Sequence, residues 1–393
     1  MTPSGTFEPQ PPRVLRLQLG EFATDVSISE TGLRSRLTNL LNRSDDVLTV
    51  FDENTAALFA PSQEQPATAG RVLVMPPGEA AKSLREVTRV LDRALDGGMD
   101  RHGTIAAVGG GALTDAAGLA ASLYMRGVRL VFLPTTLLAM VDAAIGGKTG
   151  INYGGYKNMV GTFYPAHAVE IYLDGLESLS NREMKSGLAE VIKAGLLGDE
   201  AILRELEELA GGERVDSGAG GDVAGGDVAG AVQAFRADRS ALAEVVERAV
   251  AVKISVVEGD FRESGVRAHL NLGHTFAHAL ESVAGFGHWT HGEAVAWGIC
   301  RALDLGVAHG VTAVDYRRRV CALLRTYGFH TGAIPLDPTA MIDAMRRDKK
   351  AAAGELRFVL QRGAQDTFVD SVDEALVWEV LRGVDHEHGP PRQ

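Results

Sequence analysis

The chain has little cysteine, no excess of positive charge and no long hydrophobic run, and each absence excludes a class of protein. Cys300 and Cys321 are the only cysteines in 393 residues, too few for a disulfide framework and typical of a reducing cytoplasm. Lys and Arg number 39 against 51 Asp and Glu, so the net charge is −12. Binding to nucleic acid or to an anionic membrane needs a basic surface and is not expected, whereas a small anionic substrate fits a locally basic pocket.

No segment has the pattern of a membrane helix or a signal peptide. The longest apolar stretches, such as 128–140, are interrupted by Arg129 and Pro134 and fall short of the roughly 18–20 residues that a membrane span needs. Residues 1–13 are polar and rich in proline, without a basic segment followed by an apolar one. We therefore expect a soluble cytoplasmic protein.

The arrangement of apolar residues indicates two domains, which the length also allows at roughly 150 residues each. Short β-branched runs alternate with helical spacing in the first part, which predicts βαβ units and a mostly parallel sheet. The expected strands are 47–51, 71–75, 104–108 and 130–133, and the expected helices between them are 83–96 and 115–124. Beyond residue 181 the expected elements are all helices: 182–197, 231–258, 274–283, 293–308, 315–327 and 338–347.

These patterns predict an α/β domain over 13–180 and an all-helical domain over 181–385. Residues 1–12 are expected to be a loose tail. Residues 211–230 contain a doubled GGDVAG unit with almost no side chain large enough to pack, which predicts a flexible Gly-rich insertion.

A first Gly-rich turn, Gly109, Gly110 and Gly111, lies between an expected strand and an expected helix. Glycine lets the backbone approach a ligand, and the N–H groups at a helix start favour a phosphate. The Rossmann pattern G-x-G-x-x-G is not met, because Thr114 occupies its last position. The segment can therefore be interpreted either as a nucleotide-binding site or as a tight turn without a ligand.

A second Gly-rich segment, GGKTG at 146–150, is similar to part of a P-loop. Walker A requires glycine where this chain has Asp142, and a carboxylate there would repel phosphates, so we reject an ATPase. Lys148 in this segment, and Lys157 with Asn158 ten residues on, are expected in polar loops that suit an anionic partner.

A third cluster combines carboxylate, lysine and histidine. Glu190 and Lys193 share one helix face at i, i+3, as His274 and His278 do at i, i+4. With His291, they can form an open Zn²⁺ site of one carboxylate and two imidazoles. The absence of H-E-x-x-H argues against a metalloprotease. Capping or core histidines are the alternative explanation.

Taken together, the motifs resemble those of the 3-dehydroquinate synthases, within the sugar phosphate cyclases. The matching blocks run in family order from about 47 to 360 and include GGGALTDAAG, GGKTGIN, KNMVGTFYP, SGLAEVIK, HLNLGHTFAHALE, HGEAVAWG and RRDKK. The resemblance implies a Rossmann-like NAD-binding domain, a helical metal domain and a homodimer. It implies a lyase of the shikimate pathway of aromatic amino acid biosynthesis, which converts 3-deoxy-arabino-heptulosonate 7-phosphate to 3-dehydroquinate and phosphate.

The same resemblance assigns residues to roles. The implied metal ligands, for Zn²⁺ or alternatively Co²⁺, are Glu190, His274 and His291. The implied NAD contacts are Asp52, Glu79, Lys82, Gly109, Gly110, Gly111, Asp115, Thr135, Thr136 and Ser178. The implied catalytic residues are Lys148, Lys193, Lys253, Arg267, Asn271 and His278. Further substrate contacts are implied for Arg126, Asp142, Lys157, Asn158 and Lys350.

Several alternatives stay open on the sequence. An enzyme making the 3-amino analogue of dehydroquinate would share every residue above. Cyclases that act on sedoheptulose 7-phosphate tend to lack the second histidine of GHT-x-x-H, whereas His278 is present here. Those making 2-deoxy-scyllo-inosose lose the GGKTG segment. A metal-dependent NAD alcohol dehydrogenase would not need the many cations, and the intact metal and cation sets argue against a binder without catalysis. Tyr172, where the family has aspartate, and Ser178, where threonine is common, suggest a divergent member.

Overall fold

The computed structural model describes residues 11–42, 46–60, 71–211, 228–285, 287–348 and 356–383. The chain forms two compact units, Met1–Leu179 with Lys253–Glu258, and Ser180–Val252 with Gly259–Gln393. Helix α8 (Arg239–Gly259) therefore contributes residues to both units. Within the described ranges, no helix is both long and apolar enough to cross a membrane.

The first unit is built on a seven-stranded sheet with the order β1-β2-β9-β6-β5-β3-β4. Its strands are β1 (Arg13–Leu19), β2 (Phe22–Ser29), β3 (Val47–Asp52), β4 (Val72–Met75), β5 (Thr104–Gly109), β6 (Arg129–Pro134) and β9 (Ala168–Tyr172). Only β1 and β2 pair antiparallel, so the predicted mostly parallel sheet is confirmed. The sequence pattern did not indicate β1, β2 or β9, which extend the sheet beyond the βαβ units.

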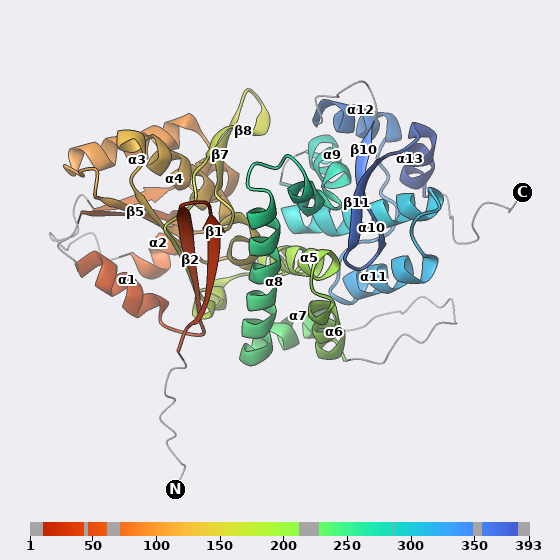
Figure 1. Ribbon diagram of the computed structural model, residues 1–393, viewed down its shortest axis with the longest axis horizontal. Coiled ribbons are helices and arrows are strands. Elements are labelled where there is room, and N and C mark those ends of the chain that lie inside the picture. The colour runs from red at the N-terminus through yellow and green to blue at the C-terminus, as the bar shows by residue number, and fades with distance from the viewer. Residues whose placement is uncertain are drawn as a thin grey trace, which may run out of the picture. The chain divides into compact units, whose positions relative to one another are not determined.

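Helices cover both faces of this sheet (Figure 1). On one face, α1 (Leu33–Asn42) packs Leu33, Leu37 and Leu40 against sheet residues that include Phe51 and Leu133. On the other lie α3 (Leu84–Asp96) and α4 (Gly111–Leu123). The short helix α2 (Glu53–Phe59) follows β3 directly. Coverage on both faces explains why β3 is buried along its whole length and consists mostly of apolar residues.

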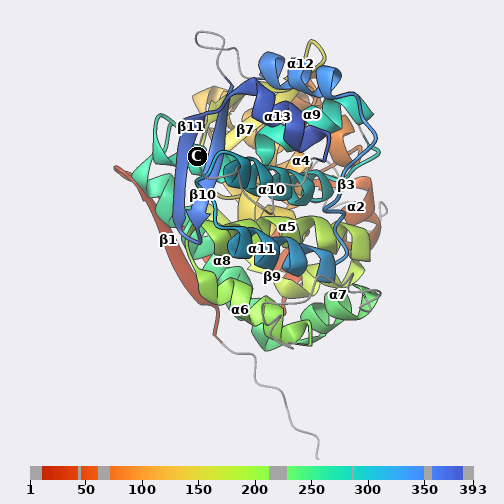
Figure 2. The same ribbon diagram turned by 90° about the vertical axis from the view of Figure 1, so that its right-hand side faces the viewer.

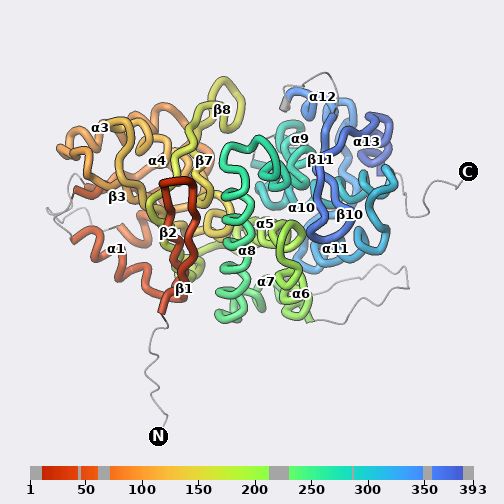
Figure 3. The backbone as a smooth tube through the Cα atoms, viewed as in Figure 1, coloured from red at the N-terminus to blue at the C-terminus, as the bar shows by residue number. Residues whose placement is uncertain are grey.

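A separate hairpin, β7 (Lys148–Tyr153) with β8 (Tyr156–Phe163), packs on α4 and can be followed in Figure 3. Lys148 begins a strand, and Lys157 and Asn158 lie within one, so the prediction of polar loops at these residues is wrong. The strands approach closely at Gly161, where a Cβ atom would lie 2.1 Å from the carbonyl oxygen of Thr149. Glycine is required there.

The second unit surrounds helix α10 (His291–Ala308), as Figure 2 shows. Its other helices are α5 (Asn181–Leu197), α6 (Glu200–Leu209), α7 (Val228–Ala237), α8, α9 (His274–Ala284), α11 (Val314–Thr326), α12 (Pro338–Asp348) and α13 (Glu374–Leu381). The predicted helical second part is confirmed, but it also contains an antiparallel hairpin, β10 (Arg357–Gly363) with β11 (Asp366–Ser371), that the pattern did not indicate. It is therefore mainly helical and not all-helical.

Two further expectations change in this unit. The predicted helix 231–258 is divided into α7 and α8. Asp238 lies between them and caps the start of α8, because its carboxylate accepts from the N–H of Ala241 at 3.0 Å. Helix α7 begins at Val228, inside the segment predicted as a flexible insertion. The rest of that insertion from 212 to 227, and residues 1–10 of the predicted tail, lie outside the described residues.

Candidate metal and substrate site

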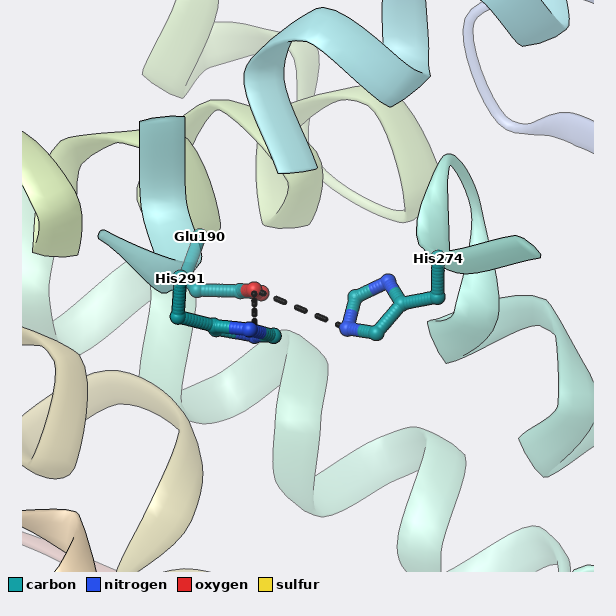
Figure 4. A group of neighbouring side chains, drawn as sticks. All are labelled: Glu190, His274 and His291. Atoms are coloured by element: carbon teal, nitrogen blue, oxygen red, sulfur yellow. Dashed lines mark ion pairs between the residues drawn. The ribbon is translucent and has the colours of Figure 1, made fainter. Parts of the chain in front are cut away.

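Three side chains predicted as metal ligands come together in the second unit (Figure 4). Glu190 lies in the middle of α5, while His274 and His291 are the first residues of α9 and α10. The Nε2 atoms of His291 and His274 lie 3.4 and 3.8 Å from Oε1 of Glu190. The potential ligand atoms of all three residues lie within 4.8 Å of one another.

Glycines bring the three helices together at this point. A Cβ atom on Gly292 would lie 2.0 Å from the carbonyl oxygen of Ser186, one helical turn before Glu190. A Cβ atom on Gly298 would lie 2.2 Å from the carbonyl oxygen of Gly273, which has a φ of +79° just before His274. Backbone therefore touches backbone between α10 and both neighbours, and this contact sets the spacing of the ligands.

The donor set fits a zinc-type ion. Metal–ligand bonds of about 2.0–2.2 Å in tetrahedral geometry place ligand atoms about 3.3–3.5 Å apart, close to the distances between Glu190 and the two histidines. The second nitrogen of each imidazole has its own partner. Nδ1 of His274 lies 3.2 Å from the carbonyl oxygen of Leu272, and Nδ1 of His291 lies 3.6 Å from Oε1 of Glu281. These partners leave Nε2 of both rings for a metal, with a fourth position open for substrate.

Neighbouring charges make the two buried imidazoles electrostatically different. Desolvation, together with the charge of Lys193, lowers the pKa of His274 well below its ordinary value. Burial also acts to lower the pKa of His291, but Glu190 and Glu281 outweigh it and raise that pKa to about 9. Without a metal, His291 is therefore protonated at neutral pH, and a metal ion must displace its proton. Lys193 forms an ion pair with Glu190 from the next turn of α5.

Glu281 gives the first testable prediction. The change Glu281→Gln removes the charge that faces Nδ1 of His291, and we expect metal affinity to fall by about 10–100-fold, the usual cost of losing such a partner. The measurement is competition with a metal-sensitive chelator at fixed pH. Glu379→Gln, on α13, is the control. An unchanged affinity in the Glu281 variant would show that the carboxylate does not support the ligand.

The candidate NAD residues gather at the carboxyl edge of the parallel sheet in the first unit. Asp52 ends β3, Gly109 ends β5, and Thr135 follows β6. The N–H of Thr135 donates to the carbonyl oxygen of Gly109 at 3.0 Å, and a Cβ atom on Gly109 would lie 3.1 Å from Asp52. A Cβ atom on Gly110 would contact Thr136 at 3.2 Å. Parallel sheets bind ligands outside this edge, beside a helix start such as that of α4.

Two polar pairs involve the remaining candidates for NAD. Lys82 lies 2.5 Å from Asp115, and Glu79 accepts from the side-chain amide of Asn152 at 2.6 Å. Asn152 was not among the predicted residues, although it lies in the quoted GGKTGIN block. Ser178 is the last residue of the short helix Leu173–Ser178. This helix follows β9 and not β3, β5 or β6.

Asp115 gives a pH prediction. Burial raises its pKa to about 6 even though Lys82 acts to lower it, while the unfolded value is near 3.8. The folded state thus holds this proton more tightly, so the contribution of Asp115 to stability is present below pH 4 and is lost as the pH rises towards 6. In Asp115→Asn, the free energy of unfolding relative to wild type should rise by about 1–2 kcal/mol between pH 4 and 6. Urea unfolding across this range measures the slope, and equal slopes would contradict the prediction.

The candidate substrate residues belong to both units. In the first unit, Lys253 lies 2.5 Å from Asp142, which is in the π-helix Ala139–Ala143. Arg126 and Asn158 have left-handed backbones, with φ of +68° and +54°. The N–H of Asn158 donates to Asn152 at 3.0 Å.

In the second unit, Arg267 is completely buried. The ring of His278 lies 5.5 Å from that of His274, centroid to centroid. The amide of Asn271 donates to Glu263 at 3.1 Å, and Glu263 is a carboxylate that sequence reasoning missed. Lys350 lies outside the described residues.

Comparisons with known proteins agree with this geometry. Residues 72–186 match the family model described as 3-dehydroquinate synthase N-terminal, and residues 225–351 match 3-dehydroquinate synthase C-terminal. A 3-dehydroquinate synthase of Desulforamulus reducens is 40% identical over 343 residues, 85% of this chain and 89% of that protein.

Two solved cyclases share the fold. The 2-epi-5-epi-valiolone synthase of Streptomyces hygroscopicus, solved with NAD⁺ and Zn²⁺, is 28% identical, with a TM-score of 0.77 and coverage of 93% of this chain and 97% of that chain. A 2-deoxy-scyllo-inosose synthase, at 24% identity and a TM-score of 0.76 over 94% and 99% of the two chains, shows the fold alone. On the family match and the 40% identical relative, this chain belongs to the 3-dehydroquinate synthase family.

Proposed function

We propose that the protein is a 3-dehydroquinate synthase, which converts 3-deoxy-arabino-heptulosonate 7-phosphate to 3-dehydroquinate and phosphate with catalytic NAD and a Zn²⁺ or Co²⁺ ion. The observation that carries the proposal is the grouping of Glu190, His274 and His291 in a chain that is 40% identical to such a synthase. The relative solved with NAD⁺ and Zn²⁺ supports the choice of cofactors.

The reaction joins oxidation, phosphate elimination, reduction and an intramolecular aldol closure. When bound, NAD takes up and returns a hydride, and the metal polarises the substrate hydroxyl as a Lewis acid. The side chains of the protein supply charge and position. Glu190, His274 and His291 hold the ion, with Lys193 beside the carboxylate.

The other cationic side chains are of opposite charge to the phosphate and the carboxylate of the substrate. Lys148, Lys157, Lys253 and Arg267 bind phosphate and carboxylate in this proposal, and Asn271 adds an amide donor. His278, whose ring lies next to that of His274, transfers protons through its ring nitrogens. Because NAD is regenerated in each turnover, the net reaction is that of a lyase. We also propose a homodimer, which light scattering after size exclusion would test.

Other substrates have specific support. The fold is similar to that of a 2-epi-5-epi-valiolone synthase, and this similarity supports a sugar phosphate without a carboxylate as a second candidate substrate. The 3-amino analogue of dehydroquinate would use the same residues. An alcohol dehydrogenase that releases NADH has less support, because Lys193 and Arg267 are buried cations with no part in simple hydride transfer.

The testing experiment measures phosphate release from 3-deoxy-arabino-heptulosonate 7-phosphate, its amino analogue and sedoheptulose 7-phosphate, with catalytic NAD⁺ and Zn²⁺. We expect the plain substrate to turn over fastest, without NADH accumulation, and the mass of the product to match 3-dehydroquinate. Preference for either of the other substrates would replace the proposed substrate. Accumulation of NADH in proportion to turnover would favour the dehydrogenase.

A further inference from the structure

One carboxylate accepts four hydrogen bonds within the turn between α8 and α9. Oδ1 of Asp260 accepts from the N–H of Ser264 at 2.9 Å and from its hydroxyl at 3.2 Å. Oδ2 accepts from the N–H groups of Gly265 and Arg267 at 2.6 and 3.2 Å. The N–H of Ser264 is the largest cause that lowers the pKa of Asp260, which is about 2, so this carboxylate is charged at neutral pH.

Burial does not hold the turn in place. Arg262, Ser264, Gly265 and Val266 are all exposed to solvent. Glu263 has a φ of +57°, a left-handed conformation that costs about 1 kcal/mol or more for a residue other than glycine. An exposed, strained segment of this kind needs specific hydrogen bonds to keep one conformation, and Asp260 provides four of them.

The turn ends at a buried cation. Arg267 has no exposed surface, although the four residues before it are accessible or partly so. Its backbone N–H is bound by Asp260, and its Nη1 donates to the carbonyl oxygen of Phe261 at 2.5 Å. The same turn carries Glu263, whose Oε1 accepts from the side-chain amide of Asn271. Both predicted substrate residues, Arg267 and Asn271, are thus connected to this turn.

We infer that Asp260 is a positioning residue, which acts on the substrate through Arg267 by fixing the turn that holds its backbone and its guanidinium. The inference rests on the proposed function only in taking Arg267 as an anion-binding group. Asp260 itself need not touch the substrate. Its removal should misplace Arg267 while the fold and the metal cluster persist, because the hydrogen bonds it makes are confined to residues 264–267.

A double-mutant cycle on the NAD- and metal-loaded enzyme tests this inference. We expect Asp260→Ala to lower kcat/KM by about 10²-fold, mostly through a higher KM, as for a misplaced binding group. In the Arg267→Ala background, the same change should cost less than about threefold, because two residues that act as one unit are not additive. Asp373→Ala is the matched control: Asp373 also accepts from a backbone N–H, that of Ala375 at the start of α13, and KM should not change.

Three further measurements keep the test decisive. Asp260→Asn, which retains one acceptor oxygen, should recover part of the lost KM and serves if the alanine variant unfolds. Calorimetric titration with inorganic phosphate should show the same non-additivity without turnover. Zinc content should match wild type, and thermal unfolding should stay cooperative, at a lower midpoint because the hydrogen bonds to Asp260 are lost. Additive effects, or an unchanged KM and phosphate affinity in both Asp260 variants, would overturn the inference. Failure of the proposed function would appear in the wild-type substrate assay, and the phosphate titration would still decide the role of Asp260.

Discussion

Replacing His274 by alanine is expected to remove the bound metal and the activity together while the protein stays folded. The change deletes one of three ligands, and the two that remain cannot keep the coordination of a catalytic zinc site. We expect turnover to fall by at least about 10³-fold, because the Lewis acid supplies several kcal/mol of charge stabilisation. Metal content by elemental analysis, together with phosphate release, measures both effects on the same sample.

The fold should survive because His274 contributes little to the core. It opens α9, and the close packing at this point comes from Gly273 against Ile299. Circular dichroism and the melting temperature of the metal-free wild type provide the reference. His309→Ala, which removes the contact between this imidazole and Asp370, is the control for losing a histidine in the same unit. Normal turnover in the metal-free His274 variant would refute the metal assignment.

The interior of the first unit was predictable from sequence because its strands are buried on both faces. The runs at 47–51 and 104–108 are apolar apart from one threonine each, and they form β3 and β5. Strands β1 and β2 were missed because an edge hairpin alternates exposed and buried residues, which weakens the apolar signal. β10 was missed for a different reason, since its buried residues pack against α10 of the second unit, a long-range contact that no local pattern reports.

The metal cluster was predictable because each ligand lies next to a helix start or within a strongly patterned helix. The residues that support it were harder to find. Glu281 lies seven residues after His274 on α9, on the same helix face, and this spacing could have indicated it. Glu263 and Asp260 gave no such signal, because their role comes from the hydrogen bonds of an irregular turn. Periodicity identifies elements, whereas it says nothing about which backbone N–H a carboxylate will accept from.

Replacing Lys253 is expected to have the second large effect on activity. A further change at its partner Asp142 distinguishes the effect on stability from the effect on catalysis. The change Lys253→Met keeps most of the length of the side chain and removes its charge. We expect kcat/KM to fall by about 10²–10³-fold, the usual cost of one lost electrostatic contact to a reacting group. We also expect the free energy of unfolding to drop by about 1–3 kcal/mol, because Asp142, with 24% of its side chain exposed, loses the cation 2.5 Å away.

Adding Asp142→Asn to Lys253→Met removes the negative charge that Lys253 faces in the wild type. If the two residues matter to folding only as a pair, the double variant should recover most of the lost stability. Activity should stay low, because an uncharged side chain at 253 still cannot bind an anionic substrate. Recovery of both stability and activity would mean that Lys253 only neutralises Asp142 and has no part in the reaction. If neither stability nor activity recovers, the loss of stability comes from the packing of the methionine side chain and not from the broken ion pair.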